Sequence, residues 1–449
     1  MQSRKIEIVH MELIRPITPT PNHLRCFKFS LLDQMAFPSS VPLALFYPSP
    51  SSYGDDQSYS YEQSRAINSS RLLVLKKCLS ETLARFYPFA GRIEENSIEC
   101  NDDGVPFFEA FAHKYRLEDV LRKPVMDVHF LPHVDQKWSY FHHATFPLVV
   151  QVTLFECGGM AIGVCASHKI IDGATLYTLI DAWAVIARGN PASNSCVDIP
   201  EFVAASTFLP EPIPHVSPSL SNIVELFQAS FDNQHVTKIF SFDASTIASL
   251  KANVVSDAVS KPTRVEVVFA VTWKCFMTTS TKTGTSSRLL YNVNIRKRLV
   301  PPLPNHCVGN VVAMTTAYKG ENDGCDLSTL VSCIRKGISD LSSKYVDESR
   351  QDEAILAIPQ DSLELALAFF KGEIELYINS WCGYKFYDVD FGWDKPLWVS
   401  SINLPVKNFI LLMDSRDSDG IDAWVHLKEK DMTVFEQQLI DQLAIGSAK

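Results

Sequence analysis

A histidine and an aspartate with the spacing His-x-x-x-Asp, His168 and Asp172, are the strongest candidates for chemistry in this chain. Among the twelve histidines, only His168 has an aspartate four residues later. An imidazole has an unperturbed pKa of about 6.5, so it can remove a proton from a substrate near neutral pH. Because the spacing is also common by chance, two interpretations stay open: a general base with its partner, or a histidine bonded to backbone beside an aspartate that caps a helix.

The residues around His168 predict a buried strand before it and a helix after it. Two β-rich runs between 148 and 166 are separated by a Cys-Gly-Gly turn, which is typical of a hairpin. The segment from Ala174 to Arg188 has apolar residues near one helix face and ends at Gly189-Asn190-Pro191. His168 is therefore expected at a strand end, where proteins often present catalytic groups.

No other catalytic motif competes with this pair. The sequence has no G-x-S-x-G nucleophile elbow, no phosphate-binding loop and no G-x-G-x-x-G fingerprint. His129 and His133 have the spacing of a helical zinc-binding pair, but Pro132 between them is incompatible with a helix interior. No metal site is therefore expected.

Two further segments are dense in unusual residue types. One runs from Asn379-Ser380-Trp381 to Asp390-Phe391-Gly392-Trp393-Asp394 and indicates a rigid aromatic loop. The other, Asn294-Ile295-Arg296-Lys297-Arg298, is a short basic run, for which solvated surface charge is the usual interpretation.

The composition fits a soluble globular protein and argues against nucleic acid as the main partner. Of the 449 residues, 46% are hydrophobic and 20% charged, and the net charge is −10. Nucleic-acid binding needs a basic face to neutralise phosphates, which this balance does not favour. At roughly 100–200 residues per domain, the length indicates at least two domains.

The sequence also indicates where the protein works. No apolar run approaches the ~18 residues of a membrane helix, and the N-terminus lacks the apolar core of a signal peptide. The eleven cysteines include no C-x-x-C pair, which fits buried thiols in a reducing compartment. We therefore expect a cytoplasmic protein that binds no membrane.

A proline-rich stretch divides the chain. We expect an N-terminal domain over 1–190, a crossover linker over 191–221 and a C-terminal domain over 222–449. In the second half, one helix is expected near 327–342, and strands are expected at 265–272, 289–295, 311–318, 398–402 and 409–413.

Together these residues resemble the plant BAHD acyltransferases, a family that uses acyl-CoA thioesters. The resemblance covers nearly the whole chain, and the two hallmark motifs occur in the expected order: H-x-x-x-D-G at His168–Gly173 and D-F-G-W-G at Asp390–Asp394. The Cys-Gly-Gly turn and the Ser-His-Lys context of His168 are most similar to the alkaloid and terpenoid O-acetyltransferase branch. Further matching stretches are Ser30-Leu31-Leu32-Asp33, Tyr87-Pro88-Phe89-Ala90-Gly91-Arg92, Cys100-Asn101-Asp102-Asp103-Gly104-Val105 and Gln151-Val152-Thr153.

The resemblance implies an α/β fold of two domains, similar to chloramphenicol acetyltransferase. Each domain would contain a mixed β-sheet with flanking helices, and an active-site channel would lie at the domain interface. The implied co-substrate is acyl-CoA, foremost acetyl-CoA, with no permanently bound cofactor. The implied acceptor is a small hydroxylated metabolite such as a terpenoid or alkaloid, and the protein would be a monomer.

The resemblance also implies roles for the His-x-x-x-Asp pair. His168 would take the proton of the acceptor hydroxyl as its oxygen attacks the thioester, without a covalent acyl-enzyme. Asp172 would either orient His168 or, as the resemblance suggests, turn away and pair with Arg296. We favour the structural role, because a paired and partly buried carboxylate is costly to leave without its partner.

The other site residues follow from the same resemblance. Asp390, Gly392 and Trp393 would support the structure of the site, and an oxyanion contact from the Trp393 indole is the alternative. The candidate coenzyme A contacts are Lys261, Thr263, Ser380 and Trp381, where a lysine would suit a CoA phosphate.

One residue departs from the family pattern: Asp394 stands where the family usually has glycine. If this position needs a positive φ, aspartate tolerates it at a cost of about 1 kcal/mol. If it faces CoA, the added negative charge would weaken binding. Other open possibilities are a malonyl, benzoyl or hydroxycinnamoyl donor, an amine acceptor, a hydrolase, and a catalytically degenerate scaffold protein.

Overall fold

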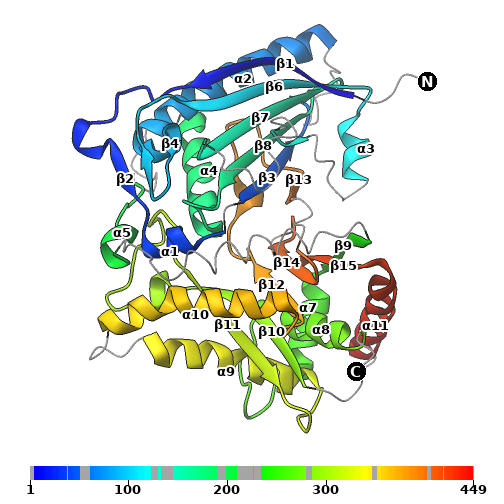
Figure 1. Ribbon diagram of the computed structural model, residues 1–449. Helices are drawn as coiled ribbons and strands as arrows, with labels where there is room; N and C mark the ends of the chain where they lie inside the picture. Colours follow the sequence, from blue (N-terminus) through cyan, green and yellow to red (C-terminus); the bar gives the residue numbers. More distant parts are fainter. Residues whose placement is uncertain are drawn as a thin grey trace. The chain divides into compact units, whose positions relative to one another are not determined.

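The structure is a computed structural model that describes residues 5–37, 39–50, 61–122, 130–132, 145–189, 199–209, 226, 234–279, 286–345, 351–401, 406–417 and 419–447. The chain forms two compact units, each built on a six-stranded mixed sheet with helices (Figure 1). Unit 1 comprises Met1–Glu211, Pro304–Asn310 and Tyr384–Ile402, and unit 2 comprises Pro212–Leu303, Val311–Gly383 and Asn403–Lys449. The expected α/β class is confirmed.

Unit 1 takes two segments from the second half of the chain, which differs from the expected division. Strand β13 (Trp398–Ser400) pairs antiparallel with β3 (Ser40–Tyr47), and residues 304–310 also belong to this unit. Pairing between residues so far apart in sequence has no local pattern, so the expected C-terminal domain over 222–449 is corrected at these two segments. The expected linker, 191–221, lies outside the described residues except for 199–209.

The large sheet of unit 1 has the strand order β1-β6-β7-β8-β3-β13, and only β6 and β7 are parallel. Its remaining strands are β1 (Lys5–Ile14), β6 (Val105–His113), β7 (Leu148–Phe155) and β8 (Met160–Ser167). A small sheet has the order β2-β5-β4, formed by Cys26–Lys28, Ser97–Glu99 and Arg92–Ile93. The helices are α1 (Leu31–Met35), α2 (Tyr61–Arg85), α3 (Leu117–Leu121), α4 (Gly173–Arg188) and α5 (Ala204–Thr207), with short 3-10 turns η1 (Asn22–Leu24) and η3 (Tyr87–Ala90).

The hairpin and the helix expected around His168 are confirmed. Strands β7 and β8 pair antiparallel across the Cys-Gly-Gly turn, and both are almost wholly buried. Helix α4 begins at Gly173 and ends at Arg188, and its C-cap Gly189 has a φ of 63°, the left-handed conformation that favours glycine. The indole Nε1 of Trp183 donates to Leu75 O at 3.0 Å, which ties α4 to α2.

Unit 2 has the strand order β11-β10-β12-β14-β15-β9, in which β10, β12 and β14 run parallel. Its strands are β9 (His235–Phe242), β10 (Ser287–Asn294), β11 (Val312–Lys319), β12 (Leu376–Ser380), β14 (Phe409–Asp414) and β15 (Ile421–Lys428). Its helices are α7 (Ala244–Val254), α8 (Arg264–Met277), α9 (Leu327–Tyr345), α10 (Gln351–Lys371) and α11 (Glu429–Ser447), with the 3-10 turn η6 (Arg296–Arg298). The turn η8 (Phe386–Asp388) belongs to unit 1.

One expected strand is wrong: residues 265–272 lie inside helix α8. Nine residues of this helix are buried, so the segment is apolar almost all round, and such a run cannot be distinguished from a buried strand by its period. Thr263 marks the true start, because its side chain caps the helix together with Glu266.

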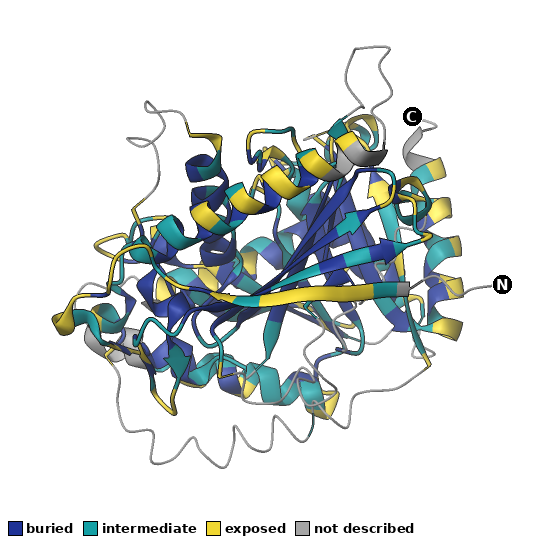
Figure 2. Cartoon of the chain, turned by 90° about the horizontal axis from the view of Figure 1, so that it is seen from above, coloured by how far each residue is buried: buried dark blue, intermediate teal, exposed yellow. Residues whose placement is uncertain are grey.

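The strands next to His168 belong to the buried part of unit 1. Figure 2 shows the central strands in dark blue, whereas the N-terminal strand β1, at the sheet edge, is largely yellow. Among the described residues, no helix combines the length and the apolar character needed to cross a membrane.

Candidate active site

His168 lies in the turn that joins β8 to α4. Its backbone N–H donates to Ser39 O at 2.8 Å, and Ile171 forms a bridge with Gly309. The buried strand before the turn and the buried helix after it both fix the backbone of this residue. The imidazole is therefore held at a strand end, as the sequence predicts.

The imidazole of His168 is held by an amide rather than by a carboxylate. Its Nδ1 lies 3.0 Å from Oδ1 of Asn310. The Nδ2 of Asn310 donates to the backbone O of His168 at 2.7 Å and to Oδ1 of Asp33 at 3.0 Å. Burial lowers the pKa of His168, and this shift is opposed by a hydrogen bond to the backbone of His168, by the charge of Asp172 and by hydrogen bonds to Asn310 and to the backbone of Ile171. The neutral imidazole is thereby favoured, which is the form that a general base needs.

Asp33 is the fully buried carboxylate of this cluster. It lies in the short helix α1, where it forms a capping box with Ser30. Its Oδ2 accepts from Ser30 N at 3.1 Å and from Ser30 Oγ at 2.6 Å, and its Oδ1 accepts from Asn310 N at 2.7 Å. Burial raises the pKa of Asp33, and these hydrogen bonds oppose the rise.

Gly309 brings Asn310 close enough to reach both His168 and Asp33. Its φ is 122°, a conformation that L side chains rarely adopt. A Cβ at this position would lie 3.2 Å from Oδ2 of Asp33. Thr175 holds the same glycine, because its Oγ1 donates to Gly309 O at 3.1 Å and lies 3.2 Å from Gly309 N. The first turn of α4 thus fixes the loop that contains Asn310.

Lys169 places a cation beside this cluster. Its Nζ donates to Gln34 O at 2.8 Å. Burial lowers the pKa of Lys169 to about 8, and the charge of Asp33 opposes that shift. The side chain therefore supplies positive charge near the buried carboxylate at neutral pH.

Asp172 caps helix α4. It is 4% exposed, and its Oδ1 accepts from Thr175 N at 2.9 Å. Within the described residues, the His168 ring hydrogen-bonds to Asn310 and has no hydrogen bond to Asp172. Arg296 is fully buried and belongs to unit 2, whereas Asp172 belongs to unit 1. The pairing of these two residues stays a prediction.

The second hallmark segment forms a tight loop around Asp390. The Oδ1 of Asp390 accepts from the backbone N–H groups of Gly392, Trp393 and Asp394 at 2.7, 3.2 and 3.0 Å. Gly392 has a φ of 101°, where glycine is favoured. Phe391 stacks on Trp393 at 5.7 Å between ring centroids.

This loop lies at the opposite end of α4 from His168. A Cβ at Gly392 would be 3.6 Å from the Cα of Arg188, which is the last residue of the helix. At about 1.5 Å per residue, the sixteen-residue helix separates Arg188 from Asp172 by roughly 24 Å. The Trp393 indole therefore cannot reach a reacting atom at His168, and the oxyanion alternative fails on geometry.

Asp394 has a φ of 120°, so this position needs the conformation that the family glycine adopts without strain. Its Oδ1 accepts from Lys395 N at 2.6 Å. Asp394→Gly is expected to raise the free energy of unfolding by about 1 kcal/mol, because the left-handed strain is removed. Urea denaturation checks this expectation.

The charge of Asp394 is tested separately by Asp394→Asn, since asparagine tolerates a positive φ equally well. If the charge weakens CoA binding, both variants lower the Michaelis constant for acyl-CoA. An unchanged Michaelis constant in both would dismiss the electrostatic effect and leave only the strain.

The candidate CoA contacts lie in two segments of unit 2. The carboxylate of Asp414 links these two segments. Asp414 pairs with Arg264 at 2.7 Å and accepts from Gly383 N at 2.7 Å, so the start of α8 and the loop after β12 lie side by side. These segments contain Lys261 and Thr263 on one side and Ser380 and Trp381 on the other.

The side chains of three candidates already have structural contacts. The Oγ1 of Thr263 accepts from Glu266 N at 3.2 Å, and the Oγ of Ser380 accepts from Cys382 N at 3.2 Å. Trp381 is 7% exposed. Lys261 is fixed through its backbone O, which accepts from Arg335 at 2.7 Å. Of the four candidates, Lys261 is therefore the one whose side chain makes no hydrogen bond or ion pair within the described residues.

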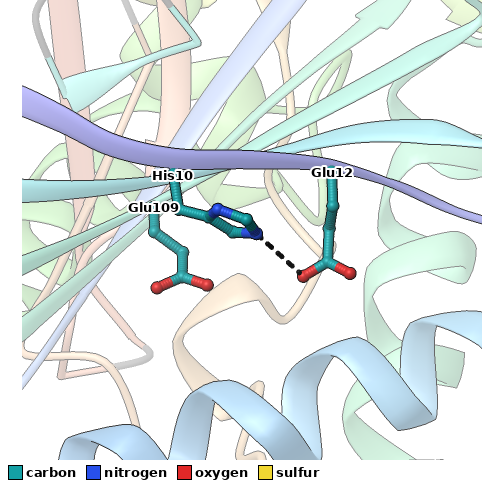
Figure 3. A group of neighbouring side chains, drawn as sticks. All are labelled: His10, Glu12 and Glu109. Carbon is teal, nitrogen blue, oxygen red and sulfur yellow. Dashed lines mark ion pairs between the residues drawn. The ribbon is translucent and has the colours of Figure 1, made fainter.

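One further group has the residue types of a metal site. His10, Glu12 and Glu109 place their ligand atoms within 4.8 Å of one another (Figure 3). However, the ammonium group of Lys76 forms ion pairs with both carboxylates. A cation of the protein thus already binds both carboxylates and offsets part of their negative charge. His129 and His133, whose zinc-like spacing is interrupted by Pro132, lie outside the described residues.

Sequence reasoning assigned no role to Asp33, Lys169, Gly309 or Asn310. The spacing Ser30-x-x-Asp33 is a capping-box pattern and signals the start of a helix. Nothing in the local sequence connects Asn310 to His168, because the two residues are 142 positions apart.

Comparison with known proteins gives matches over almost the full length. A family model described as the Transferase family matches residues 4–441. Stemmadenine O-acetyltransferase from Catharanthus roseus is 33% identical over 454 residues, covering 98% of each chain. Limonoid 1-O-acetyltransferase from Citrus sinensis is 35% identical over 448 residues, covering 96% of each. The crystal structure of vinorine synthase superposes with a TM-score of 0.74 at 31% identity, covering 96% of each chain.

Proposed function

Because this chain belongs to the Transferase family, that of the plant BAHD acyltransferases, we propose that it transfers an acetyl group from acetyl-CoA to a hydroxyl group of a terpenoid or alkaloid. The resemblance seen in the sequence is confirmed, and the chain is an acyltransferase. Relatives that are about one-third identical over nearly their full length are named as O-acetyltransferases of stemmadenine and of limonoids. Their names support acetyl as the donor group and a hydroxylated metabolite as the acceptor.

The observation on which the mechanism depends is the imidazole of His168, whose Nδ1 lies 3.0 Å from Oδ1 of Asn310. Nε2 removes the proton of the acceptor hydroxyl while the oxygen attacks the thioester carbonyl carbon. The tetrahedral oxyanion collapses, the C–S bond breaks, and the imidazolium returns the proton to the leaving thiolate. No covalent acyl-enzyme is needed, because the thioester is already activated and the two substrates react directly.

The pH dependence of catalysis checks the role of His168. Burial lowers its pKa, and the charged groups nearby are Asp172 at the start of α4, Lys169, and Asp33 on α1. Since the base works unprotonated, kcat/KM is expected to stay level near neutral pH and to fall in acid with a midpoint below about 6.5. Initial rates in overlapping buffers give the profile. A midpoint above this value would contradict a neutral, buried base.

The lowered pKa of His168 also determines how the stability of the protein changes with pH. Protons bind the exposed imidazole of the unfolded chain more tightly than the buried one. The contribution of His168 to folding is therefore present above about pH 6.5 and is lost as the pH falls below it. Rates should be measured only where circular dichroism shows a folded protein.

Coenzyme A is proposed to bind unit 2 through Lys261, with Thr263, Ser380 and Trp381 shaping the segments beside it. An ammonium group suits a phosphate, and Lys261 precedes the N-terminus of α8, where backbone N–H groups also favour anions. Such a local cation would let a protein with a net charge of −10 hold an anionic co-substrate.

The experiment that tests the proposed function measures thiol release from acetyl-CoA with a panel of hydroxylated terpenoids and alkaloids. The proposal expects release that depends on the acceptor and matches an acetylated product by mass spectrometry. Release without any acceptor would indicate a hydrolase, and no release with any donor would indicate a scaffold protein.

The protein is also proposed to act as a monomer in the cytoplasm, with no nucleic acid or membrane as partner. The net charge of −10 supports the part of this proposal that concerns nucleic acid, because phosphate neutralisation needs a basic face. Size-exclusion chromatography with light scattering measures the oligomeric state directly.

A further inference from the structure

We propose that Asp33 is a positioning residue for the acyl transfer, which acts through Asn310 to keep the hydrogen of the His168 imidazole on Nδ1 and leave Nε2 unprotonated. The catalytic consequence rests on the proposed function. The geometry rests only on hydrogen bonds within unit 1.

The orientation of the Asn310 amide follows from its neighbours. An amide NH2 group has two hydrogens and can only donate, whereas the amide oxygen can only accept. The Nδ2 of Asn310 lies 2.7 Å from His168 O and 3.0 Å from Asp33 Oδ1, and both of these atoms are acceptors. Turning the amide over would place its oxygen against two other oxygens. Oδ1 must therefore face the imidazole.

The tautomer of His168 follows from the same argument. Since Oδ1 of Asn310 only accepts, the Nδ1 that lies 3.0 Å from it must donate. In a neutral imidazole, a hydrogen on Nδ1 leaves the lone pair on Nε2. Asn310 thus selects the tautomer that can act as a base through Nε2.

Asp33 is what fixes Asn310 in this orientation. Its carboxylate accepts four hydrogen bonds, two from Ser30 and two from Asn310. A carboxylate that only accepts matches the ionised form, and Lys169 provides the opposite charge nearby. The backbone N–H and the side-chain Nδ2 of Asn310 both donate to the same oxygen of Asp33. Rotation of the Asn310 side chain would break the bond from Nδ2 to this buried charge and the bond to His168 O.

Asp172, the aspartate of the His-x-x-x-Asp motif, does not occupy the position that Asp33 has in this cluster. Asp172 uses Oδ1 to cap α4, and the His168 ring has no hydrogen bond to it within the described residues. The carboxylate that orients the imidazole is therefore contributed by α1 and acts through an amide.

The first test is direct and needs no activity. In protein labelled with ¹⁵N-histidine, long-range proton–nitrogen correlation spectra distinguish a protonated Nδ1 from a protonated Nε2, and His168→Gln identifies the signal. The proposal expects Nδ1–H in the wild-type protein above the pKa of the ring. Nε2–H as the main tautomer would overturn it.

The second test replaces Asn310 with leucine, which removes both donors and the acceptor at similar volume. The tautomers should then mix, and kcat should fall by about 10²- to 10³-fold, since a wrong tautomer disables a general base. The Michaelis constant for acetyl-CoA should change less than about 3-fold, because the ground-state contacts remain. Wild-type kcat in a folded Asn310→Leu protein would overturn the proposal.

Asn68→Leu is the matched control. Asn68 is 3% exposed, lies on α2 and donates to Gly158 O at 3.2 Å. Gly158 precedes β8 and His168 follows it, so eight residues at about 3.3 Å each put this contact roughly 26 Å from His168. The control should lower the melting temperature while kcat and the His168 tautomer stay unchanged. If it lowers kcat as much as Asn310→Leu, the effect is one of stability and the proposal fails.

The third test asks whether Asp33 acts through Asn310. Asp33→Asn should lower kcat by about 10- to 100-fold, by analogy with the loss found for outer partners of metal-binding histidines. In the double variant with Asn310→Leu, kcat should be no lower than in Asn310→Leu alone, because one residue works through the other. Additive losses would show two independent roles and contradict the proposal.

These tests separate the inference from the proposed function. If no acceptor is ever acetylated, the proposed function fails, but the spectra still report the tautomer. If transfer occurs and the wild-type tautomer is Nε2–H, only the role of Asp33 and Asn310 fails.

Discussion

Replacing His168 with alanine is expected to lower kcat/KM for acetyl transfer by about 10²- to 10⁴-fold while the protein stays folded. The ring is the group placed to remove the proton of the acceptor hydroxyl, since Nδ1 faces Asn310 and Nε2 is left for the substrate. Loss of the ring removes one hydrogen bond to Asn310, but the Nδ2 of Asn310 still donates to the backbone O at position 168. We therefore expect a small change in melting temperature and a large change in turnover.

His23→Ala serves as the control for this variant. His23 is exposed on η1 and has no hydrogen bond or ion pair within the described residues. It should keep the activity of the wild type. Turnover of His168→Ala within a few-fold of the wild type would remove His168 from the mechanism.

Replacing Asp172 with alanine is expected to lower activity and thermal stability together. Asp172 is buried and caps α4, whose sixteen residues pack into the centre of unit 1. Loss of an N-cap costs about 0.5–2 kcal/mol, and any partner of the buried carboxylate would be left uncompensated. Differential scanning calorimetry and steady-state kinetics on the same preparation give the two losses.

Asp172→Asn separates the cap from the charge. Asparagine caps a helix as well as aspartate does, so the difference between the two variants measures the cap. Any remaining loss of stability in Asp172→Asn reports the predicted pair with Arg296. If both variants instead lose about 10⁴-fold in kcat at an unchanged melting temperature, Asp172 orients His168 as in a catalytic triad.

The parts of the site that the sequence predicts are those with local patterns. The hairpin before His168 and the helix after it follow from period, a glycine turn and a Gly-Asn-Pro stop, and the structure confirms both. The position of His168 at a strand end follows from these two elements.

The partners of His168 could not be predicted, because they are distant in the chain. Asn310 is 142 residues from His168 and 277 residues from Asp33. Their meeting depends on residues 304–310, which belong to unit 1, and on the positive φ of Gly309. The His-x-x-x-Asp spacing indicates Asp172 instead, whose Oδ1 caps helix α4.

The wrong prediction of a strand at 265–272 has a different physical origin. A helix that is buried on nearly every side has no polar face, so it loses the 3.6-residue period that identifies helices. The capping box of Thr263 and Glu266 is the signal that distinguishes it.

The central claim is that the acyl group passes directly from the CoA thioester to an acceptor hydroxyl. The most direct measurement follows a radiolabelled acetyl group from acetyl-CoA during turnover with an accepted terpenoid or alkaloid, using its deoxy analogue in parallel. We predict that label enters the hydroxylated acceptor in equal amount to the thiol released, and that neither the protein nor the deoxy analogue is labelled. Label held covalently by the protein, or thiol released equally with the deoxy analogue, would contradict this claim.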